Sequence, residues 1–411
     1  MRSLLVLACF AFSSATHASV LEPIAYFEAA MKNPRLHDTD GELFCWNARI
    51  AADEFIEGYE ATGDVRWLES AEHYFSFLLG KLTRDPDGCE GWIGGSIWGT
   101  PGRKQLDAYR TDALVGDAIL LAPMLRFAEL VKADPALAAR FSKSADLYVE
   151  KARLIGWEKW NARGTYYRDA AGFGSYRMPL HFIDAKTWTW VDTPVVPHSE
   201  NLNKHSAMAI VMVRLWRITG SVEYRARAEE IMTRLKHLFR YFPEEDRVAW
   251  NFWMPHGPHD LVNGKLASWV GVHPNRANYQ NEEVTRMVEM YDSGLVFEQR
   301  DLQRLVNANR FMMPTEIDAA WRASDGSSDA GRLWTSLARF DETLRHRTLA
   351  LARRAPPLKQ ALALAYDENV TAKNLGWRRR FVRDELAVRI FAQSAATGCR
   401  ARRDGGVARP D

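Results

Sequence analysis

The chain has 411 residues, of which 47% are hydrophobic, so it can bury a large core. Its 54 lysine and arginine residues nearly balance its 52 aspartate and glutamate residues, which leaves a net charge of +2. Such a small charge gives no support for binding to nucleic acid. No apolar run approaches the ~20 residues that a membrane helix needs, so we expect no membrane span.

The first eighteen residues have the pattern of a secretory signal peptide. Arg2 provides a positive start, residues 4–12 form a short apolar segment, and residues 13–18 end in small side chains, after which we expect cleavage. The protein is therefore expected to be periplasmic or secreted. We expect one catalytic domain over residues 19–395 and a disordered tail over residues 396–411.

The mature chain keeps the three cysteines Cys45, Cys89 and Cys399. An odd number excludes a fully paired framework, although a disulfide between Cys45 and Cys89 stays open in an oxidising compartment. Their spacing matches no zinc-ligand pattern.

Two segments carry the same pattern, one around Gly63 and one around Gly220. In both, an apolar helix reaches a Thr-Gly pair whose glycine suits a left-handed helix cap. Asp64 and Ser221 then suit the N-cap of a second helix. After Gly220 that helix is amphipathic, whereas residues 207–216 before it are apolar almost all round, which indicates burial on every side. Such pairs are typical of two concentric rings of helices.

The same pairing recurs along the chain. We expect helix pairs at residues 112–132 with 136–154, 281–291 with 295–311, and 331–353 with 358–366, followed by a helix near residues 379–393. The predicted fold class is therefore all-α, an (α/α) toroid of antiparallel helical hairpins. An open helical-repeat solenoid is the alternative.

The hairpins are joined at one end by long connections, roughly residues 83–110, 155–203 and 241–280. Loops of this length in a compact domain are usually functional. They hold nine of the fifteen tryptophans, and aromatic faces suit the apolar C–H faces of pyranose rings. About half of these rings are expected to pin the loops to the helices. The tryptophans expected to contact substrate are Trp98, Trp188, Trp190 and Trp253.

The segments that enter the expected inner helices share this rim and carry residues suited to β-elimination from a uronate. Helix N-termini favour a bound carboxylate. Loss of the C5 proton builds negative charge on that carboxylate, which Asn203, His205 and Arg276 could neutralise. Tyr279 could act first as base and then as acid, helped by a lowered pKa, or His205 could be the base. Each residue also has an ordinary structural explanation, such as a helix cap or a packed ring.

A histidine-rich loop lies on the same rim. Its Gly-Pro spacing matches no zincin pattern, so we expect no metal and no cofactor. Substrate contacts or loop packing are expected instead for His256, His259 and His273, and Glu200 is a further candidate for contacting substrate. An inverting glycoside hydrolase is the main alternative enzyme, because its two carboxyl groups, about 6.5–9.5 Å apart, could come from Asp112, Asp192, Glu200 and Asp260.

Three stretches of this region resemble a known family. Residues 250–260 (WNFWMPHGPHD), 270–279 (VGVHPNRANY) and 283–297 look like the helical-toroid polysaccharide lyases and are most similar to polysaccharide lyase family 38, the glucuronan and alginate lyases. The resemblance is best over about residues 185–300. It implies a metal-independent lyase whose partner is an acidic polysaccharide.

The resemblance also implies roles for single residues. It gives Asn203 and His205 the role of neutraliser, Arg276 a supporting cation and Tyr279 the acid/base. Many such lyases have the asparagine and histidine adjacent, whereas Lys204 separates them here, so Asn201 stays open as the neutraliser. The Asp-x-Ser-His-Gly motif of related epimerase-like toroids is missing. A hydrolase or epimerase on the same fold, or a non-catalytic polysaccharide-binding protein, remain the other hypotheses.

Overall fold

The computed structural model describes residues 22–95, 108–178, 181–192, 198–268, 270, 278–312 and 333–352. The expected signal peptide, the expected helices after residue 353 and the C-terminal tail lie outside these ranges. So do the predicted site residues Trp98, His273 and Arg276.

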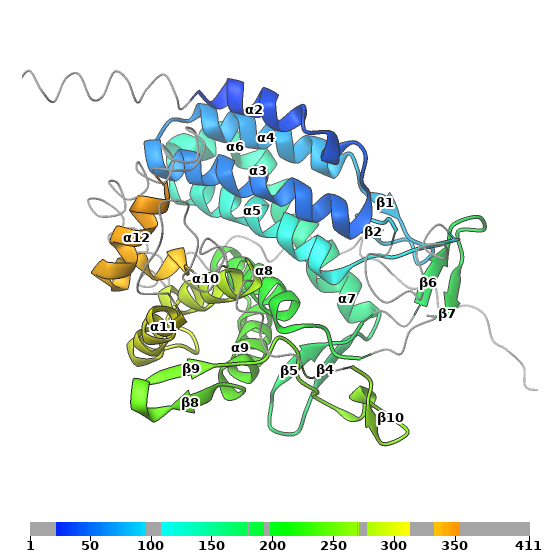
Figure 1. The fold of residues 1–411 in the computed structure, drawn as a ribbon. Helices are drawn as coiled ribbons and strands as arrows, with labels where there is room; N and C mark the ends of the chain where they lie inside the picture. The colour runs from blue at the N-terminus through cyan, green and yellow to red at the C-terminus, as the bar shows by residue number, and fades with distance from the viewer. Residues whose placement is uncertain are drawn as a thin grey trace, which may run out of the picture.

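The described chain is built from antiparallel helical hairpins (Figure 1). They pair α3 (Gly41–Thr62) with α4 (Arg66–Leu79), α5 (Leu114–Ala133) with α6 (Pro135–Lys151), and α8 (Leu202–Thr219) with α9 (Val222–His237), followed by α10 (Asn278–Asp292) and α11 (Gln299–Met312). The inner helices α3, α5, α8 and α10 pack against one another in chain order. Arg49 of α3 also forms an ion pair with Glu282 of α10, so the first and fourth inner helices meet. This order confirms the predicted all-α, (α/α)-toroid fold class.

The two rows of helices differ in burial as predicted. α5 and α8 are enclosed on nearly every side, whereas α6 and α9 bury one face and expose the other. α2 (Pro23–Met31) covers α4 from outside (Figure 1). One apolar core cluster runs through all of these hairpins, which is what a chain of repeated hairpins needs to bury its apolar faces.

The turns predicted at Gly63 and Gly220 are confirmed. Gly63 (φ 71°) ends α3 and Gly220 (φ 76°) ends α8, each in the left-handed conformation that glycine adopts without strain. Ser221 is the N-cap of α9, although its side chain accepts no capping hydrogen bond. α4 begins one residue later than predicted, with Val65 at the N-cap position, but the Asp64 carboxylate accepts a hydrogen bond from the backbone N–H of Arg66 over 3.0 Å.

Two C-terminal helices differ from the prediction. α11 begins at Gln299 rather than Leu295, because Val296 has a positive φ of 59° and interrupts the helical path. The single helix expected over residues 331–353 is, within the described part, a 3-10 segment (Thr335–Phe340) followed by α12 (Glu342–Ala352). Asp341 separates them, and its carboxylate accepts a hydrogen bond from the backbone of Leu344 in the first turn of α12.

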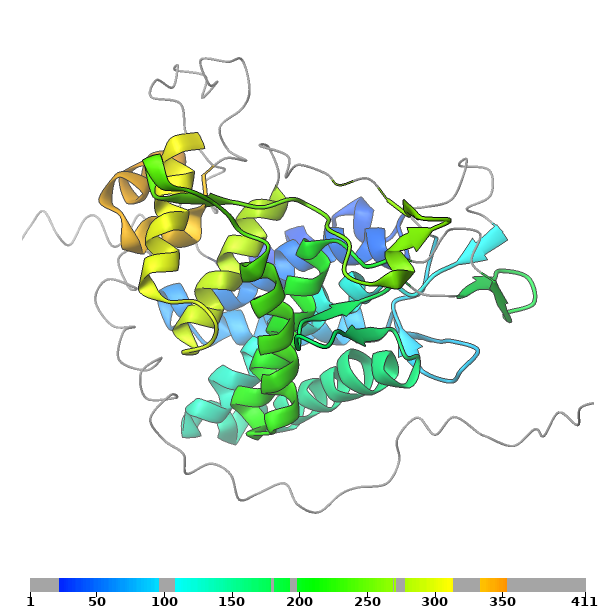
Figure 2. The ribbon, with the colours of Figure 1, turned by 90° about the horizontal axis from the view of Figure 1, so that it is seen from below.

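The long connections form short antiparallel hairpins. These are β1 (Thr83–Arg84) with β2 (Glu90–Gly91), β4 (Tyr166–Arg168) with β5 (Gly174–Tyr176), β8 (Arg240–Phe242) with β9 (Arg247–Ala249), and β10 (Leu261–Val262) with β11 (Lys265–Leu266). A three-stranded sheet joins β3 (Tyr109–Arg110), β6 (His181–Asp184) and β7 (Trp190–Asp192). Seen from below, β6 and β7 extend from one end of the molecule, far from β8 and β9 (Figure 2).

The structure shows no disulfide between Cys45 and Cys89. Cys45 on α3 and Cys89 before β2 are both buried, and burial is the main cause that raises the pKa of Cys45. Among the described helices, none has the length and apolar character to cross a membrane.

Candidate functional site

Polar side chains follow one face of α3 from its first turn. Glu42, Trp46, Arg49 and Asp53 recur every three or four residues, which is the spacing of one helix face. This face points to the other inner helices, because Glu42 contacts Lys204 and Arg49 contacts Glu282. At the rim, where the inner helices begin, it forms a candidate site that we call the rim cluster: Glu42, Trp46, Glu200, Lys204, Phe252 and Tyr279.

Lys204 is the charged centre of the rim cluster. Its Nζ lies 3.6 Å from Oε1 of Glu42 and 3.3 Å from Oε2 of Glu200, and all three side chains are less than a tenth exposed. Burial alone would lower the pKa of Lys204, but Glu200 and Glu42 outweigh it and raise the pKa above its ordinary value. Lys204 is therefore a stable cation held between two carboxylates.

The shared cation also limits how far apart the carboxylates can be. Since one Nζ contacts both groups, its two contacting oxygens are at most about 7 Å apart. This upper limit overlaps the lower part of the range of carboxyl separations in glycoside hydrolases, about 5–9.5 Å depending on the mechanism.

Three partly exposed aromatic rings border Glu42, Lys204 and Glu200. Trp46 donates its indole N–H to Glu42 over 3.1 Å. The Tyr279 ring lies 6.1 Å from the Trp46 ring and 5.5 Å from the Phe252 ring, measured between centroids. These rings come from α3, α10 and the loop before α10, so only the folded chain brings them together. Apolar ring faces beside carboxylates are the combination that a pyranose ring can contact through both its C–H groups and its hydroxyls.

Tyr279 is the predicted acid/base that the structure places in this cluster, but its ionisation differs from the prediction. Burial, followed by the charges of Glu282 and Glu42, raises the pKa of Tyr279 and outweighs the lowering effect of Lys204 and Arg49. The expectation of a lowered pKa is therefore wrong for the surroundings that the structure describes. The phenol of Tyr279 stays protonated at neutral pH and is suited to donating a hydrogen bond.

His205 lies on another face of the first turn of α8 and contacts β5. Its Nε2 is 2.9 Å from the backbone nitrogen and 3.0 Å from the carbonyl oxygen of Tyr176. Burial, followed by the positive charge of Arg234, lowers the pKa of His205 to about 3, so the ring is neutral. No hydrogen bond or ring contact within the described ranges joins His205 to Tyr279.

Asn203 is also enclosed in this turn. Its side chain is almost fully buried, and its Oδ1 has no hydrogen-bond partner among the residues that the structure describes. Its backbone carbonyl accepts a hydrogen bond from Arg286 of α10 over 2.6 Å. Asn201 is the N-cap of α8, with no capping hydrogen bond to its side chain. The predicted neutralisers thus share the rim with Tyr279 but are not joined to it by a direct contact.

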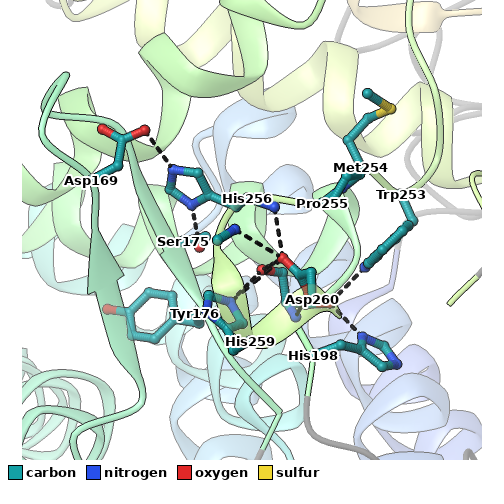
Figure 3. A network of polar contacts seen from close by, with 12 residues as sticks. Asp169, Ser175, Tyr176, His198, Trp253, Met254, Pro255, His256, His259 and Asp260 are labelled. Atoms are coloured by element: carbon teal, nitrogen blue, oxygen red, sulfur yellow. Dashed lines mark hydrogen bonds and ion pairs between the residues drawn. The ribbon is translucent and has the colours of Figure 1, made fainter. Parts of the chain in front are cut away.

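The histidine-rich loop forms a second polar cluster around Asp260 (Figure 3). The carboxylate of Asp260 accepts hydrogen bonds from the backbone N–H and the hydroxyl of Ser199, over 2.7 and 2.8 Å, and from the backbone N–H of His256 over 2.6 Å. Asp260 is fully buried. The hydrogen bonds between Asp260 and Ser199 therefore hold this loop against the segment that precedes α8.

His256 and His259 of this loop both contact other side chains of the protein. Nδ1 of His256 lies 2.6 Å from the hydroxyl of Ser175 and its Nε2 lies 3.1 Å from Asp169, both on or beside the β4–β5 hairpin (Figure 3). Nε2 of His259 lies 2.9 Å from the hydroxyl of Ser199. Both ring nitrogens of His256 are occupied, so loop packing, one of the two predicted alternatives, accounts for its position.

A third cluster, which we call the anchor cluster, lies at the start of α5. Lys159 of α7 (Lys159–Ala162) contacts Asp112 over 2.5 Å and Asp117 over 2.8 Å, with no side-chain exposure. Arg163 contacts Asp112 over 2.9 Å and also pairs with Asp85. Burial is the main cause that raises the pKa of Asp117 to about 7, and that of Asp85 to about 8. Asp112, a predicted rim carboxylate, is therefore enclosed by two cations.

The described tryptophans of the long connections include both buried and partly exposed side chains. Four of those described are buried, and the indole of the predicted substrate residue Trp253 donates to the carbonyl of Ser199 over 2.7 Å. Trp190 is half-buried, and Trp188 is 40% exposed. The buried tryptophans are Trp92, Trp160, Trp250 and Trp253.

Glu42, Trp46, Lys204 and Phe252 are the rim residues that sequence reasoning missed. A signal existed for the first two, because Glu42, Trp46, Arg49 and Asp53 break the apolar pattern of an inner helix at regular spacing. No comparable signal exists for Phe252, which lies in an irregular loop. Asp192, another predicted carboxylate, is exposed at the end of β7.

Comparison with known proteins adds the following. No family model matches the chain, and no curated protein matches it. Several solved structures align over most of its length. An α-1,6-mannanase, GH76A of Salegentibacter sp. HEL1_6, aligns at 17% identity over 79% of this chain and 75% of that chain, with a TM-score of 0.38. The cellobiose 2-epimerase of Spirochaeta thermophila DSM 6192 aligns at 14% identity over 79% and 73%, with a TM-score of 0.36. A D-mannose isomerase aligns at 11% identity over 79% and 75%, with a TM-score of 0.39. Likeness of this degree carries no argument about the reaction of this chain.

Proposed function

We propose that the chain is an enzyme that hydrolyses a glycosidic bond of a polysaccharide at the rim cluster. The observation that carries the proposal is the pair Glu42 and Glu200, held on either side of the Lys204 ammonium and bordered by partly exposed aromatic rings. Hydrolysis needs one carboxyl group to protonate the leaving oxygen and a second to act on the other face of the sugar.

The surroundings of the two glutamates differ, which suggests their roles. Both glutamates contact Lys204, but Glu42 also accepts a hydrogen bond from Trp46, a further donor that suits a carboxylate acting as an acceptor. We assign Glu42 to activating water and Glu200 to protonating the leaving oxygen. We assign the protonated phenol of Tyr279 to donating a hydrogen bond to a sugar hydroxyl.

β-Elimination from a uronate is the second candidate function. It is favoured by the presence of Lys204 and Arg49 near Tyr279, because cations could hold a substrate carboxylate there. The resemblance to polysaccharide lyases supports it as well. The raised pKa of Tyr279 and the neutral ring of His205, committed to β5, weigh against the predicted base.

One assay separates these candidates. The protein is incubated with glucuronan, alginate and a neutral glucan, and both reducing ends and the ultraviolet absorbance of unsaturated uronate are followed. Hydrolysis yields reducing ends alone, whereas new absorbance would replace the hydrolase assignment with a lyase. Binding without either signal would identify a non-catalytic polysaccharide-binding protein.

Matched variants then test the residues. Glu42→Gln and Glu200→Gln should each lower turnover by about 10²–10⁴-fold, the range of acid/base catalysis, while the thermal unfolding curve stays close to that of the wild type. Glu28→Gln, on the exposed surface of α2, is the control and should retain full activity. Near-wild-type turnover in both rim variants would refute the assignment.

A further inference from the structure

The turn between β6 and β7 is closed by an unusually complete set of hydrogen bonds. Oδ1 of Asp184 accepts from the backbone N–H groups of Lys186 and Thr187, each over 2.9 Å, and from the Thr187 hydroxyl over 3.1 Å. The backbone N–H of Trp188 donates to the carbonyl of Asp184 over 2.9 Å. These contacts determine the path of the chain as it reaches residue 188.

That path forces Trp188 into the left-handed region, with φ at 54°. Hairpin turns of this kind normally have glycine or asparagine at such a position, because a bulky side chain is strained there. A strained residue persists where the surrounding structure over-determines it, and such residues concentrate at binding sites. A glycine would satisfy the turn without strain, so the tryptophan ring needs another explanation.

Burial does not supply that explanation. Trp188 is 40% exposed, unlike the buried Trp92, Trp160, Trp250 and Trp253. Its indole N–H donates to the carbonyl of Arg84 on β1 over 2.8 Å. The ring is therefore held in one orientation by its polar edge while much of its apolar surface stays in water.

A second tryptophan lies on the same hairpin. Trp190 is two residues further on, at the start of β7. The guanidinium of Arg163 lies 5.4 Å from the Trp190 ring, and the same arginine contacts Asp112 just before α5. Arg163 thus links the hairpin to the rim at which the inner helices begin. The hairpin projects from that end of the molecule (Figure 1).

We propose that Trp188 is a sugar-binding platform, on which a pyranose ring of the polysaccharide stacks outside the rim cluster. This inference rests on the proposed function and deepens it, because it assigns a binding subsite away from the bond that is cleaved. The fixed indole offers an apolar face without loss of side-chain freedom on binding, which favours affinity. The platform contributes to binding of a long chain and takes no part in the chemical step.

Trp188→Gly gives a sharp test, since glycine relieves the backbone strain and removes the ring. We expect a melting temperature equal to or above that of the wild type. The KM for the polysaccharide that the wild type cleaves should rise about fivefold or more, the effect of removing an aromatic binding contact, with kcat within about twofold. Retention in gels containing glucuronan, alginate or a neutral glucan should weaken for the same polysaccharide. Trp188→Phe, which keeps an aromatic face, should recover much of the affinity.

Tyr241→Ala is the matched control, because Tyr241 is also an exposed aromatic residue on a hairpin, β8–β9, far from β6–β7 (Figure 1). It should leave KM and retention unchanged. Wild-type KM and retention in Trp188→Gly would overturn the platform alone, as would a lowered melting temperature, since the ring would then be structural. A wild-type protein that neither cleaves nor is retained by any of the three polysaccharides would overturn the proposed function together with the platform.

Discussion

Two lysines of this protein each lie between two carboxylates, yet their surroundings differ. Lys159 in the anchor cluster contacts Asp112 and Asp117 over 2.5 and 2.8 Å with no side-chain exposure. Lys204 in the rim cluster contacts Glu42 and Glu200 over the longer distances of 3.6 and 3.3 Å and keeps slight exposure. The ion pairs of the anchor cluster are short and shielded from solvent. Those of the rim cluster are longer and are bordered by partly exposed aromatic rings.

The difference shows how to distinguish structural from functional charge. Strongly shifted pKa values occur in structural ion-pair networks as well as in functional sites. In this protein, the carboxyls whose pKa is raised to about 7 and about 8, Asp117 and Asp85, belong to the enclosed anchor cluster. The anchor joins the loop after α4, the start of α5 and α7, so its ion pairs stabilise the connections around the rim. A looser set of ion pairs can exchange contacts with a substrate, which a closed set cannot do without losing stability.

The largest effect on stability is expected from Lys159→Met. The substitution keeps the length of the side chain and removes the charge, which leaves Arg163 as the cation beside Asp112 and the Trp160 indole N–H as the donor to Asp117. Removing one partner of a buried ion pair costs about 3–5 kcal/mol. Chemical denaturation should show this loss in the free energy of unfolding. A loss below about 1 kcal/mol would contradict the structural role of the anchor.

The same substitution in the rim cluster, Lys204→Met, should act on activity more than on stability. We expect turnover to fall about 100-fold, because the two glutamates lose the cation that positions them. The free energy of unfolding should fall by about 1–2 kcal/mol. Full activity in Lys204→Met would remove Lys204 from the site.

Tyr279→Phe sharpens the choice between the two reactions. If the phenol only donates a hydrogen bond to a sugar hydroxyl, turnover should fall about tenfold, the worth of one hydrogen bond. If Tyr279 is the acid/base of an elimination, the loss should reach about 10²–10⁴-fold. Steady-state kinetics on the cleaved polysaccharide decides between them. Melting temperature serves as the check that the Trp46 and Phe252 contacts are retained.

The smallest effect concerns the Asp260 loop and its dependence on pH. Burial, followed by the charge of Arg234, lowers the pKa of His256 to about 4, whereas an unfolded histidine has a pKa of about 6.5. As pH falls from about 6.5 to about 4, the unfolded state takes up the proton first, so stability is full above this window and declines within it.

A comparison of the wild type with one variant isolates the contribution of His256 to the pH dependence of stability. The free energy of unfolding is measured from pH 7 to pH 4 for the wild type and for His256→Gln, which cannot titrate. The wild type should lose more stability across the window than the variant. Equal slopes would show that His256 does not sense pH, and that His205 and the carboxylates account for any acid instability.

The arrangement of helices follows from local signals in the sequence. The turns at Gly63 and Gly220, the Asp134 cap of α6 and the alternation of enclosed and amphipathic helices depend on residues within one or two turns of each other. Such short-range preferences are readable without knowledge of the fold. The late starts of α11 and α12 were missed because they depend on the positive φ of Val296 and on the Asp341 cap, which periodicity does not reveal.

The composition of the site was decided by tertiary structure. Neighbours in one helical turn are rotated by about 100°, so Lys204 faces Glu42 while the adjacent His205 faces β5. Glu42 and Glu200 are far apart in sequence and meet only because α3 and α8 are both inner helices. The sign of the pKa shift of Tyr279 likewise depends on burial and on Glu282 and Glu42. Sequence spacing identifies the rim, and the direction in which each side chain points is determined only when the helices pack.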